Sequence, residues 1–408
     1  MLNLIWILTL FHSSQAQTHY QPEFRVAEQT EKQNVFPREH VTHFRVQVFP
    51  HLGSYATPQG RDVVSQSVSV TSTGDCSERK TTLDENHEWL KGDVVRTQKL
   101  PASFRAGEGS VTYFECPESF IIHRAPSLKS IEYAGDFVVV TTKAQVKIIN
   151  ILEPDTYLKG VIPSEVSASW PDEVLKAQAV AARTYAWWTV TQTRNKSSDF
   201  DMDDTVAYQA YMGLSNQDNR SDSAADVTTH QVLTANGQLI KAYFSADSGG
   251  YTADAAEVFG AVSYCKAVRE TYDQSIHSAS AWTKIYTNEE LAKELISAKL
   301  LKEKVSVKSI SIREADRTGS GRARSLEVKG QDGVTYSIDG NSFRFATHIK
   351  STLFEIAKTD HGFLFSGKGY GHGVGMAQIG ALQYAKQFHW SYDQILKFYY
   401  SGVNLVHD

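Results

Sequence analysis

The spacing of hydrophobic residues changes near residue 150, and this change limits the folds that the chain can adopt. Before it, short β-branched or aromatic runs are separated by Gly, Pro, Asp and Ser, which is typical of strands. These runs are FRVQVF, VSQSVSV, SVTYFE and FIIHR, followed by residues 137–141 and 145–150. After residue 150, apolar residues recur at helical spacing. We therefore expect an α+β fold, with a β-rich region at residues 44–129 and a domain of mixed strands and helices at 130–408.

Two neighbouring segments carry the helical pattern. Pro154 suits the first position of a helix, and apolar residues then recur at helical spacing until Pro163 interrupts them. A second helix begins at Pro171, where Asp172 and Glu173 suit the positive end of the helix dipole. Its continuation is rich in Ala, Leu, Lys and Gln, which are strong helix formers, and the alanines let neighbouring elements approach closely.

The remainder of the chain alternates between shorter strands and helices. Asn236-Gly237 is a typical hairpin turn between two β-like runs. We expect further helices at residues 288–300, 379–387 and 392–400, and strands at 305–312 and 323–329.

The first sixteen residues have the pattern of a secretory signal peptide, with an apolar stretch at residues 4–11 and then Ser14 and Ala16 at the positions that signal peptidase reads. We expect cleavage after Ala16, a flexible polar leader at residues 17–43, and a location in the periplasm or outside the cell. No Lys or Arg precedes the apolar stretch, so a buried N-terminal strand or a retained anchor stays an alternative. No later apolar stretch is long enough to suggest a stable membrane anchor.

The chain has three cysteines, Cys76, Cys116 and Cys265. In an oxidising compartment Cys76 and Cys116 can pair, because both lie in the N-terminal part, and Cys265 is then left single. Three unpaired thiols are the alternative. The sequence has no CxxC and no Cys/His cluster, so it signals no metal site, and we expect no cofactor.

The formal net charge of -5 describes a mildly acidic chain. Proteins that bind nucleic acid present a basic surface to the phosphate backbone. We therefore expect no nucleic-acid partner, while composition leaves the oligomeric state open.

Glu165 is the ionisable side chain that most suggests catalysis. It stands alone between Lys159 and Asp172, in the sequence GVIPSEVSASW, among Val, Ile, Pro, Ala and Trp. Apolar surroundings destabilise a charged carboxylate, so its pKa rises toward the range where it can donate a proton near neutral pH. Glycosidases need such a general acid. An ordinary exposed Glu, or an ion near the start of the next helix, is the alternative.

Six glycines lie within residues 367–380. Their spacing gives neither the G-x-G-x-x-G of dinucleotide-binding proteins nor a complete P-loop. Glycine here supplies backbone freedom and allows the close approach of a ligand or another strand. We expect His372 to project from this turn and line a binding site, with Tyr370 and Gln378 as further candidates, and a buried structural histidine is the alternative.

Arg183 and Tyr185 lie on the Ala-rich helix, two residues apart and so on different faces. Arg183 is either a buried ion-pair partner or a donor to a sugar. Ser248 precedes Gly249-Gly250 in a turn that can bring backbone amides to a ligand, although a plain hairpin is the alternative. Arg183, Tyr185 and Ser248 are therefore candidate substrate-binding residues.

Three segments together resemble the sporulation stage II protein D family, whose domain is also called SpoIID/LytB. They are YLKGVIPSEVSASWPDEVLKAQAVAARTYA at residues 157–186, FSADSGGYTADAAEVFG at 244–260, and GKGYGHGVGMAQIGALQYA at 367–385. They occur in the family's order, and the resemblance spans roughly residues 130–405. It implies a SpoIID-like catalytic core within residues 130–408.

Family members are known as peptidoglycan lytic transglycosylases, so the resemblance implies that Glu165 is the catalytic glutamate and that peptidoglycan glycan strands are the partner. Such an enzyme protonates the oxygen between N-acetylmuramic acid and N-acetylglucosamine and passes through an oxocarbenium-like state. The same carboxylate then removes the proton from the muramyl 6-hydroxyl, and a 1,6-anhydro ring closes. The resemblance also places the glycine-rich segment beside the active site.

Two other functions stay open. A hydrolytic, lysozyme-like muramidase delivers water to the same oxocarbenium ion, with Asp155 or Asp172 as a second carboxylate. A non-catalytic peptidoglycan-binding protein retains Glu165 without using it.

The chain departs from part of the family after the second segment, where some members carry a Cys/His zinc site. Only Cys265 and His277 occur there in this chain, so we expect no zinc. Trp282 is a candidate for stacking on the face of a sugar.

Overall fold

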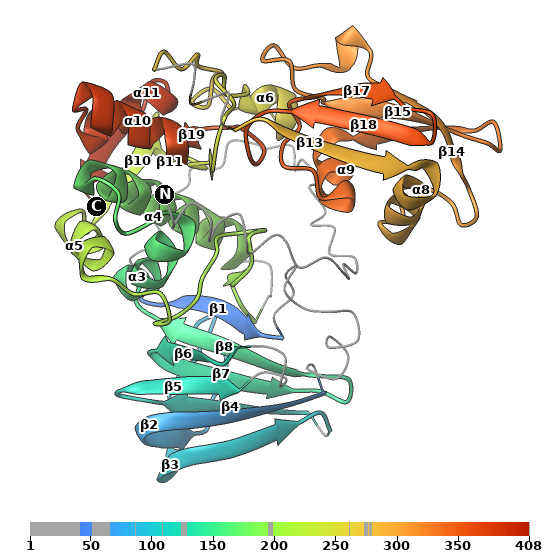
Figure 1. Ribbon diagram of the computed structural model, residues 1–408. Helices are drawn as coiled ribbons and strands as arrows, with labels where there is room; N and C mark the ends of the chain where they lie inside the picture. The colour runs from blue at the N-terminus through green and yellow to red at the C-terminus, as the bar shows by residue number, and fades with distance from the viewer. Residues whose placement is uncertain are drawn as a thin grey trace.

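The computed structural model describes residues 41–50, 66–85, 87–107, 109–123, 129–194, 199–260, 262–272, 276 and 280–407. The predicted signal peptide and nearly all of the predicted leader lie outside these residues. Val41, inside the predicted leader, is buried in the main hydrophobic core, so the packed part of the chain begins before the predicted boundary at residue 44. Figure 1 shows a sheet region at the bottom and a helical layer above it, which also holds the C-terminus. A third part at the upper right, residues 282–367, is called the C-terminal lobe here.

A large mixed sheet forms the lower part of the molecule. Its strands follow the order β6-β5-β2-β4-β7-β8-β1-β9, and β3 also pairs with β2 (Figure 1). On β2, buried Val68 and Val70 alternate with exposed serines, as expected of a strand with one face toward the core. The strands are β1 (Phe44–Phe49), β2 (Ser67–Arg79), β3 (Val94–Arg105), β4 (Ser110–Glu115), β5 (Ser119–His123), β6 (Ile131–Ala134), β7 (Asp136–Thr141), β8 (Val146–Leu152) and β9 (Met202–Asp203).

This sheet continues across residue 130, where the sequence predicted a domain boundary. β5 before that residue pairs with β6 after it, and β4 pairs with β7. The strand-rich part therefore extends through β8, and residue 130 is not a break in the fold. The predicted α+β class is confirmed.

A disulfide links Cys76 on β2 to Cys116, which directly follows β4, with 4.5 Å between the Cα atoms. The pairing predicted from the sequence is confirmed. Cys265 is unpaired and buried.

The helices α3 (Pro154–Glu165) and α4 (Asp172–Thr193) follow the sheet where the sequence predicted them. Pro163 does not end α3, and that part of the prediction is wrong. Proline removes one backbone hydrogen bond from a helix. Here it lies in the last turn, and the N–H of Val166 still donates to the Ile162 carbonyl at 2.9 Å. The extra residues make Glu165 the last helical residue.

The long helix α4 is at the centre of the helical layer. Most of its side chains are buried, including the alanines from Ala177 to Ala186, which let other helices pack closely. The helices in contact with it are α3, α5 (Asn219–Val227), α10 (Gln378–Phe388) and α11 (Tyr392–Tyr399). Among the described residues, no helix is both long enough and apolar enough to cross a lipid bilayer.

Short strands complete this layer. Asn236 and Gly237 have positive φ values of 51° and 76° and join β10 (Gln231–Ala235) to β11 (Gln238–Leu239), which confirms the predicted hairpin. β20 (Asn404–His407) pairs with the other side of β10. β12 (Phe244–Ser245) runs parallel to β19 (Met376–Ala377), and the short helix α6 (Ala255–Val258) follows β12 in the chain.

The C-terminal lobe has a hydrophobic core of its own. Trp282, Phe343, Phe354 and Phe365 pack together in it. Its elements are β13 (Trp282–Thr287), α8 (Asn288–Ser297), β14 (Val307–Ser311), the 3-10 turn η3 (Glu314–Asp316), β15 (Ser325–Gly330), β16 (Thr335–Asp339), α9 (Gly340–Thr347), β17 (Phe354–Lys358) and β18 (Gly362–Gly367).

Candidate active site

Glu165 ends α3, and its side chain is partly exposed. Its Oε1 accepts a hydrogen bond from the backbone N–H of Ala210 at 2.7 Å. The side chain of Gln378 donates a second hydrogen bond to the carboxylate. Both donors come from segments distant in the sequence, so the tertiary fold assembles this site.

The loop that carries Ala210 is held against α3 by Tyr211. The Tyr211 ring packs onto Gly160, where an added Cβ atom would lie 2.5 Å from the ring, so a larger residue would displace it. The Tyr211 hydroxyl donates to Asn150 Oδ1 at 2.9 Å. These contacts fix the Ala210 N–H next to the Glu165 carboxylate.

Burial raises the pKa of Glu165 from its ordinary value of 4.5 to about 7. The side chain reaches the surface over part of its area, yet packed protein surrounds its carboxyl. The hydrogen bonds from Ala210 and Gln378 lower the pKa, because they stabilise the charged form, but burial is the larger effect. At neutral pH the carboxyl is present both with and without its proton, so it can act first as an acid and then as a base.

Gln378 is the first residue of α10 and directly follows β19. Its Nε2 also donates to Gln178 Oε1, at 3.3 Å, on the buried central helix. The parallel pairing of β19 with β12 sets where α10 begins. The structure therefore brings Gln378, predicted from the glycine-rich segment, to Glu165, predicted from a segment some two hundred residues earlier.

Tyr185 lies on α4 and is partly exposed. Its pKa is raised well above the ordinary value, by burial first and then by the negative charges of Asp203 and Glu165. Asp203 is thus a second carboxylate in this region, and sequence reasoning missed it. It is 2% exposed, and its Oδ1 accepts the backbone N–H of Thr205 at 2.9 Å. No local signal reveals it, because β9 reaches this place by pairing with β1.

His372 lies against aromatic side chains and is partly exposed. Its ring centroid is 5.1 Å from that of Phe259 and 6.1 Å from that of Tyr243, both edge to face. The ring therefore belongs to an aromatic surface, as expected of a group that lines a carbohydrate site.

Burial and nearby positive charges keep the His372 imidazole neutral, against the opposite effect of its hydrogen bond with the Phe244 backbone. Its Nδ1 accepts the backbone N–H of Val374 at 3.0 Å, and the backbone of Phe244 bonds to the ring as well. Burial, followed by the positive charges of Arg344 and Arg322, lowers the pKa of His372 to about 3. A neutral imidazole can contact a ligand, but it holds no extra proton to donate.

Comparison with known proteins adds to this geometry. The family model described as stage II sporulation protein, SpoIID, matches residues 142–234, which include Glu165 and the Ala210 loop. A second model, described as a domain of unknown function, DUF8618, matches residues 256–375. An uncharacterized protein of Brachyspira hyodysenteriae is 37% identical over 326 residues, which cover 79% of this chain and 81% of that protein. This chain belongs to the SpoIID family.

Two further relatives come from Bacillus subtilis. Its stage II sporulation protein D is 27% identical over 335 residues, covering 78% of this chain and 88% of that protein. Its amidase enhancer is 36% identical over 296 residues, covering 61% of this chain and 40% of that protein. This SpoIID protein therefore spans most of the stage II sporulation protein D and less than half of the amidase enhancer.

Ser248 belongs to a sealed network, which we call the Glu270 cluster: Ser248, Glu270, Tyr272 and Tyr399. Ser248 is fully buried, its Oγ donates to Glu270, and it accepts the Gly250 N–H at 3.0 Å. The hydroxyls of Tyr272 and Tyr399 also donate to Glu270, at 3.0 and 2.5 Å. A substrate could touch the Ser248 side chain only if this network opened, so the geometry favours a structural role for it.

Tyr370 is partly exposed and pairs with Asp247 through backbone hydrogen bonds of 2.9 and 3.1 Å. This pairing fixes the start of the glycine-rich turn against the segment that carries Ser248. No described contact joins the Tyr370 side chain to Glu165, and its place in the site stays a prediction.

Arg322 links the C-terminal lobe to the glycine-rich turn of this SpoIID protein. It is fully buried, and its Nη2 donates to the Ser248 carbonyl. Gly373 adopts a φ of +75°, and an added Cβ there would lie 2.2 Å from the Arg322 guanidinium carbon. The predicted close approach at this glycine therefore involves a neighbouring side chain of the protein.

Arg183 is an ion-pair partner inside the protein. The guanidinium is 1% exposed and donates to Asp155 Oδ1 from Nε and Nη2, at 3.1 and 2.9 Å. It also donates to the carbonyls of Ala225 and Gln231, at 3.0 and 3.3 Å. Of the two roles that the sequence left open, the geometry favours the ion pair over a contact with sugar.

Both carboxylates that were candidates for a hydrolytic partner of Glu165 are held in ion pairs. Asp155 accepts from Arg183 and from the Thr229 hydroxyl. Asp172 lies at the surface, where its Oδ1 accepts from Arg220 Nη2 at 2.5 Å.

Trp282 does not present its ring to a sugar, and the prediction of stacking is wrong. The residue is 7% exposed and packs on Phe354 in the core of the C-terminal lobe, with 6.2 Å between ring centroids. His277 lies outside the described residues. Within the described part of the chain, no group of three or more His, Cys, Asp or Glu side chains could hold a metal ion.

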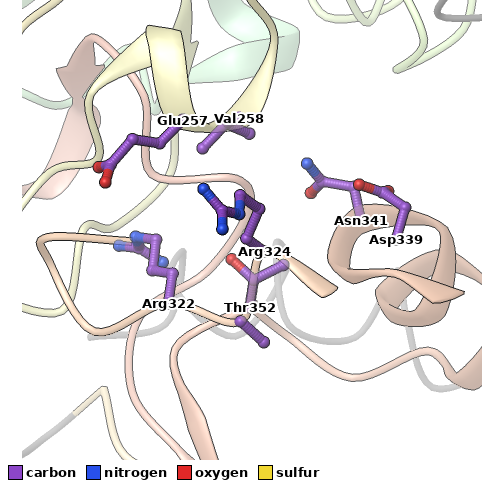
Figure 2. A pocket seen from close by; sticks show the side chains of 8 residues that line it. Glu257, Val258, Arg322, Arg324, Asp339, Asn341 and Thr352 are labelled. Carbon is purple, nitrogen blue, oxygen red and sulfur yellow. The ribbon is translucent and has the colours of Figure 1, made fainter. Parts of the chain in front are cut away.

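A polar pocket lies between α6 and the C-terminal lobe, with a volume of about 230 Å³ that includes space open to solvent. Figure 2 shows side chains that converge on it from α6, from the Arg322–Arg324 segment and from the start of α9. Among the described residues, the hydrogen bonds of the Glu165 carboxylate come from Ala210 and Gln378 and not from this lining, although Arg322 also lies against Gly373 of the glycine-rich turn. The lining residues of the pocket are Glu257, Val258, Arg322, Ala323, Arg324, Asp339, Asn341 and Thr352.

Proposed function

We propose that this SpoIID protein cleaves the glycan strands of bacterial peptidoglycan between N-acetylmuramic acid and N-acetylglucosamine, as a lytic transglycosylase with Glu165 as its general acid and base. The observation that carries the proposal is Glu165, a partly exposed residue whose carboxyl has its pKa raised by burial to about 7 and is held in place by Ala210 and Gln378. Membership of the SpoIID family supports a role related to the cell wall.

Glu165 supplies the proton for bond cleavage. The protonated carboxyl gives its proton to the bridging oxygen while the bond from that oxygen to muramyl C1 breaks. The N-acetylglucosamine end leaves as an alcohol, and positive charge develops at C1 and the ring oxygen. The Ala210 N–H and the Gln378 amide stabilise the carboxylate that forms.

The same carboxylate completes the reaction. It removes the proton from the muramyl 6-hydroxyl, and that oxygen bonds to C1 to give the 1,6-anhydro sugar. No water is consumed, and Glu165 ends the cycle with its proton. Tyr185, Gln378 and His372 are the predicted binding residues that we propose contact the glycan, because each belongs to the surroundings of Glu165 or to the adjoining aromatic surface.

The surroundings of Glu165 favour this route over hydrolysis. A hydrolytic enzyme of the lysozyme type uses a second carboxylate to activate water or to form a covalent intermediate. Asp155 and Asp172 are held in ion pairs, and Asp203 is 2% exposed. A transglycosylase needs one carboxyl because the substrate provides its own nucleophile.

We also propose that the protein acts in the cell envelope after export and cleavage behind Ala16. The Cys76–Cys116 disulfide supports an oxidising compartment. N-terminal sequencing of protein from the envelope fraction should then begin at Gln17, and an intact Met1 would contradict this.

Mass spectrometry of the products from purified glycan strands tests the reaction. We expect muramyl ends that are lighter by one water than the ends left by hydrolysis, and no such ends with Glu165→Gln. Hydrolysed muramyl ends would favour a muramidase. Uncut strands with the wild-type protein would favour a non-catalytic peptidoglycan-binding role.

A further inference from the structure

Lys241 lies between β11 and β12 among aromatic rings, and it is partly exposed. Its Nζ is 4.4 Å from the ring centroid of Trp188, 4.9 Å from that of Tyr243 and 5.9 Å from that of Tyr185. We call these three residues, Tyr185, Trp188 and Tyr243, the aromatic cage. Each of them is partly exposed, so the cage is open toward the surface.

The Lys241 ammonium group has no carboxylate partner among the residues that the structure describes. Lys176, by contrast, is 2.7 Å from Glu173. Burial lowers the pKa of Lys241 to about 8, and no neighbouring negative charge raises it again. The rings attract the cation but do not replace a counter-ion, so an anionic ligand would gain from binding here.

The cage adjoins the proposed active site on two sides. Tyr185, one wall of the cage, is close enough to Glu165 for that carboxylate to raise its pKa. Tyr243, another wall, contacts the His372 ring, and the Lys241 charge helps to lower the pKa of His372. A glycan in contact with Glu165 and His372 therefore passes next to Lys241.

The backbone holds Lys241 in this place. Its backbone N–H donates to the Tyr264 hydroxyl at 3.0 Å, and β12, which begins at Phe244, pairs with β19. The long side chain therefore starts from a fixed point, and the cage rings limit where its ammonium group can go.

We propose that Lys241 binds a carboxylate of the glycan substrate and makes the enzyme selective for anionic strands. This inference rests on the proposed function for the identity of the ligand. Muramyl residues carry a lactyl ether that ends in a carboxyl group, and stem peptides attached there bring carboxylates of their own. Either source offers the same chemistry, an oxygen anion for one ammonium group, while the cage rings contact the apolar faces of the sugars.

Binding measured without turnover tests this. Calorimetry in the Glu165→Gln background compares Lys241→Met with the unchanged lysine, because methionine keeps an unbranched side chain of similar length and loses the charge. The ligands are peptide-free glycan strands, strands with stem peptides, and each after amidation of its carboxyl groups. Lys284→Met is the matched control, since Lys284 lies 5.2 Å from the Tyr286 ring in the C-terminal lobe.

We expect Lys241→Met to weaken binding of at least one of the two untreated glycans by about tenfold or more. Binding of the same glycan after amidation should weaken by less than about twofold. Loss on peptide-free strands identifies the lactyl carboxylate, and loss only on peptide-bearing strands identifies the peptide. Equal changes on treated and untreated glycan, no change, or no binding of any untreated glycan would overturn the proposal.

A second comparison needs no change at Lys241. In the same Glu165→Gln background, amidation of the glycan should itself weaken binding by about tenfold, and equal affinity would overturn the proposal. Failure of the proposed function gives a different result. Wild-type protein would leave the strands uncut while the Lys241-dependent preference for untreated glycan persisted.

Discussion

Glu165 and Glu270 are both carboxyls whose pKa is raised by burial, yet their surroundings differ. Glu165 is partly exposed and accepts from a backbone N–H and an amide side chain. Glu270 is 3% exposed and is enclosed by the hydroxyls of Ser248, Tyr272 and Tyr399. A proton on Glu165 can pass to a ligand, whereas one on Glu270 stays within its network. A raised pKa therefore points to catalysis only where a substrate can reach the group.

Of the substitutions at Glu165 and Glu270, Glu165→Gln should have the largest effect, and that effect is on turnover. Glutamine keeps the shape of the side chain but cannot release a proton to the glycosidic oxygen, so turnover of glycan strands should fall by at least about 10²-fold. The thermal melting temperature should not fall. Glu303→Gln, at an exposed position of the C-terminal lobe, is the control and should keep full activity. If Glu165→Gln kept its turnover, Glu165 would not be the general acid and base.

Glu270→Ala should show the opposite pattern. The change leaves a cavity and strands buried hydroxyls, so the free energy of unfolding should fall by about 2–5 kcal/mol, measured by urea denaturation. Turnover per folded molecule, measured well below the melting temperature, should stay within about threefold of the wild type. A large loss of turnover with unchanged stability would show that the Glu270 cluster takes part in the reaction.

The pH dependence of stability separates Glu165 from the rest of the chain. Its folded-state pKa of about 7 lies above the ordinary 4.5, so folding favours the protonated form. That contribution is fully present below pH 4.5 and is lost as the pH rises through 7. Wild type should therefore lose about 1–3 kcal/mol relative to Glu165→Gln between pH 5 and pH 8 in urea denaturation, since partial exposure reduces the full effect. Parallel stability curves would contradict the raised pKa.

Gln378→Leu should give the smallest change. The Gln378 amide lowers the pKa of Glu165, so its loss should raise that pKa further. The decline of kcat/KM on the alkaline side should move to higher pH by less than about one unit. Gln387→Leu, on an exposed position of the same helix, is the control and should leave the profile in place. A shift toward lower pH would show that the Gln378 hydrogen bond raises the pKa of Glu165 and does not lower it.

The sequence predicted those features that depend on neighbouring residues in the chain. Glu165 stands among apolar residues in the sequence, and burial raises its pKa as that pattern predicted. The sequence could not reveal Ala210 as a neighbour of Glu165 or Asp203 as a neighbour of Tyr185, because a loop packed on Gly160 brings the first and the β1–β9 pairing brings the second.

Cations show the same division. Arg183 and Lys241 both have apolar neighbours in the sequence. In the structure Arg183 forms an ion pair with Asp155, whereas Lys241 lies in the aromatic cage. Residue type and local sequence do not distinguish these two outcomes. The tertiary structure determines which cation has an internal carboxylate partner and which one can bind an anionic ligand.

Direct titration of the Glu165 carboxyl tests the central claim. In carbon NMR of protein with labelled glutamate, the Glu165 signal is identified by its absence in Glu165→Gln. We expect its titration midpoint near pH 7, as burial predicts for this carboxyl. A midpoint near the ordinary value of 4.5 would contradict the account, because Glu165 would then hold too little proton at neutral pH to act as the general acid.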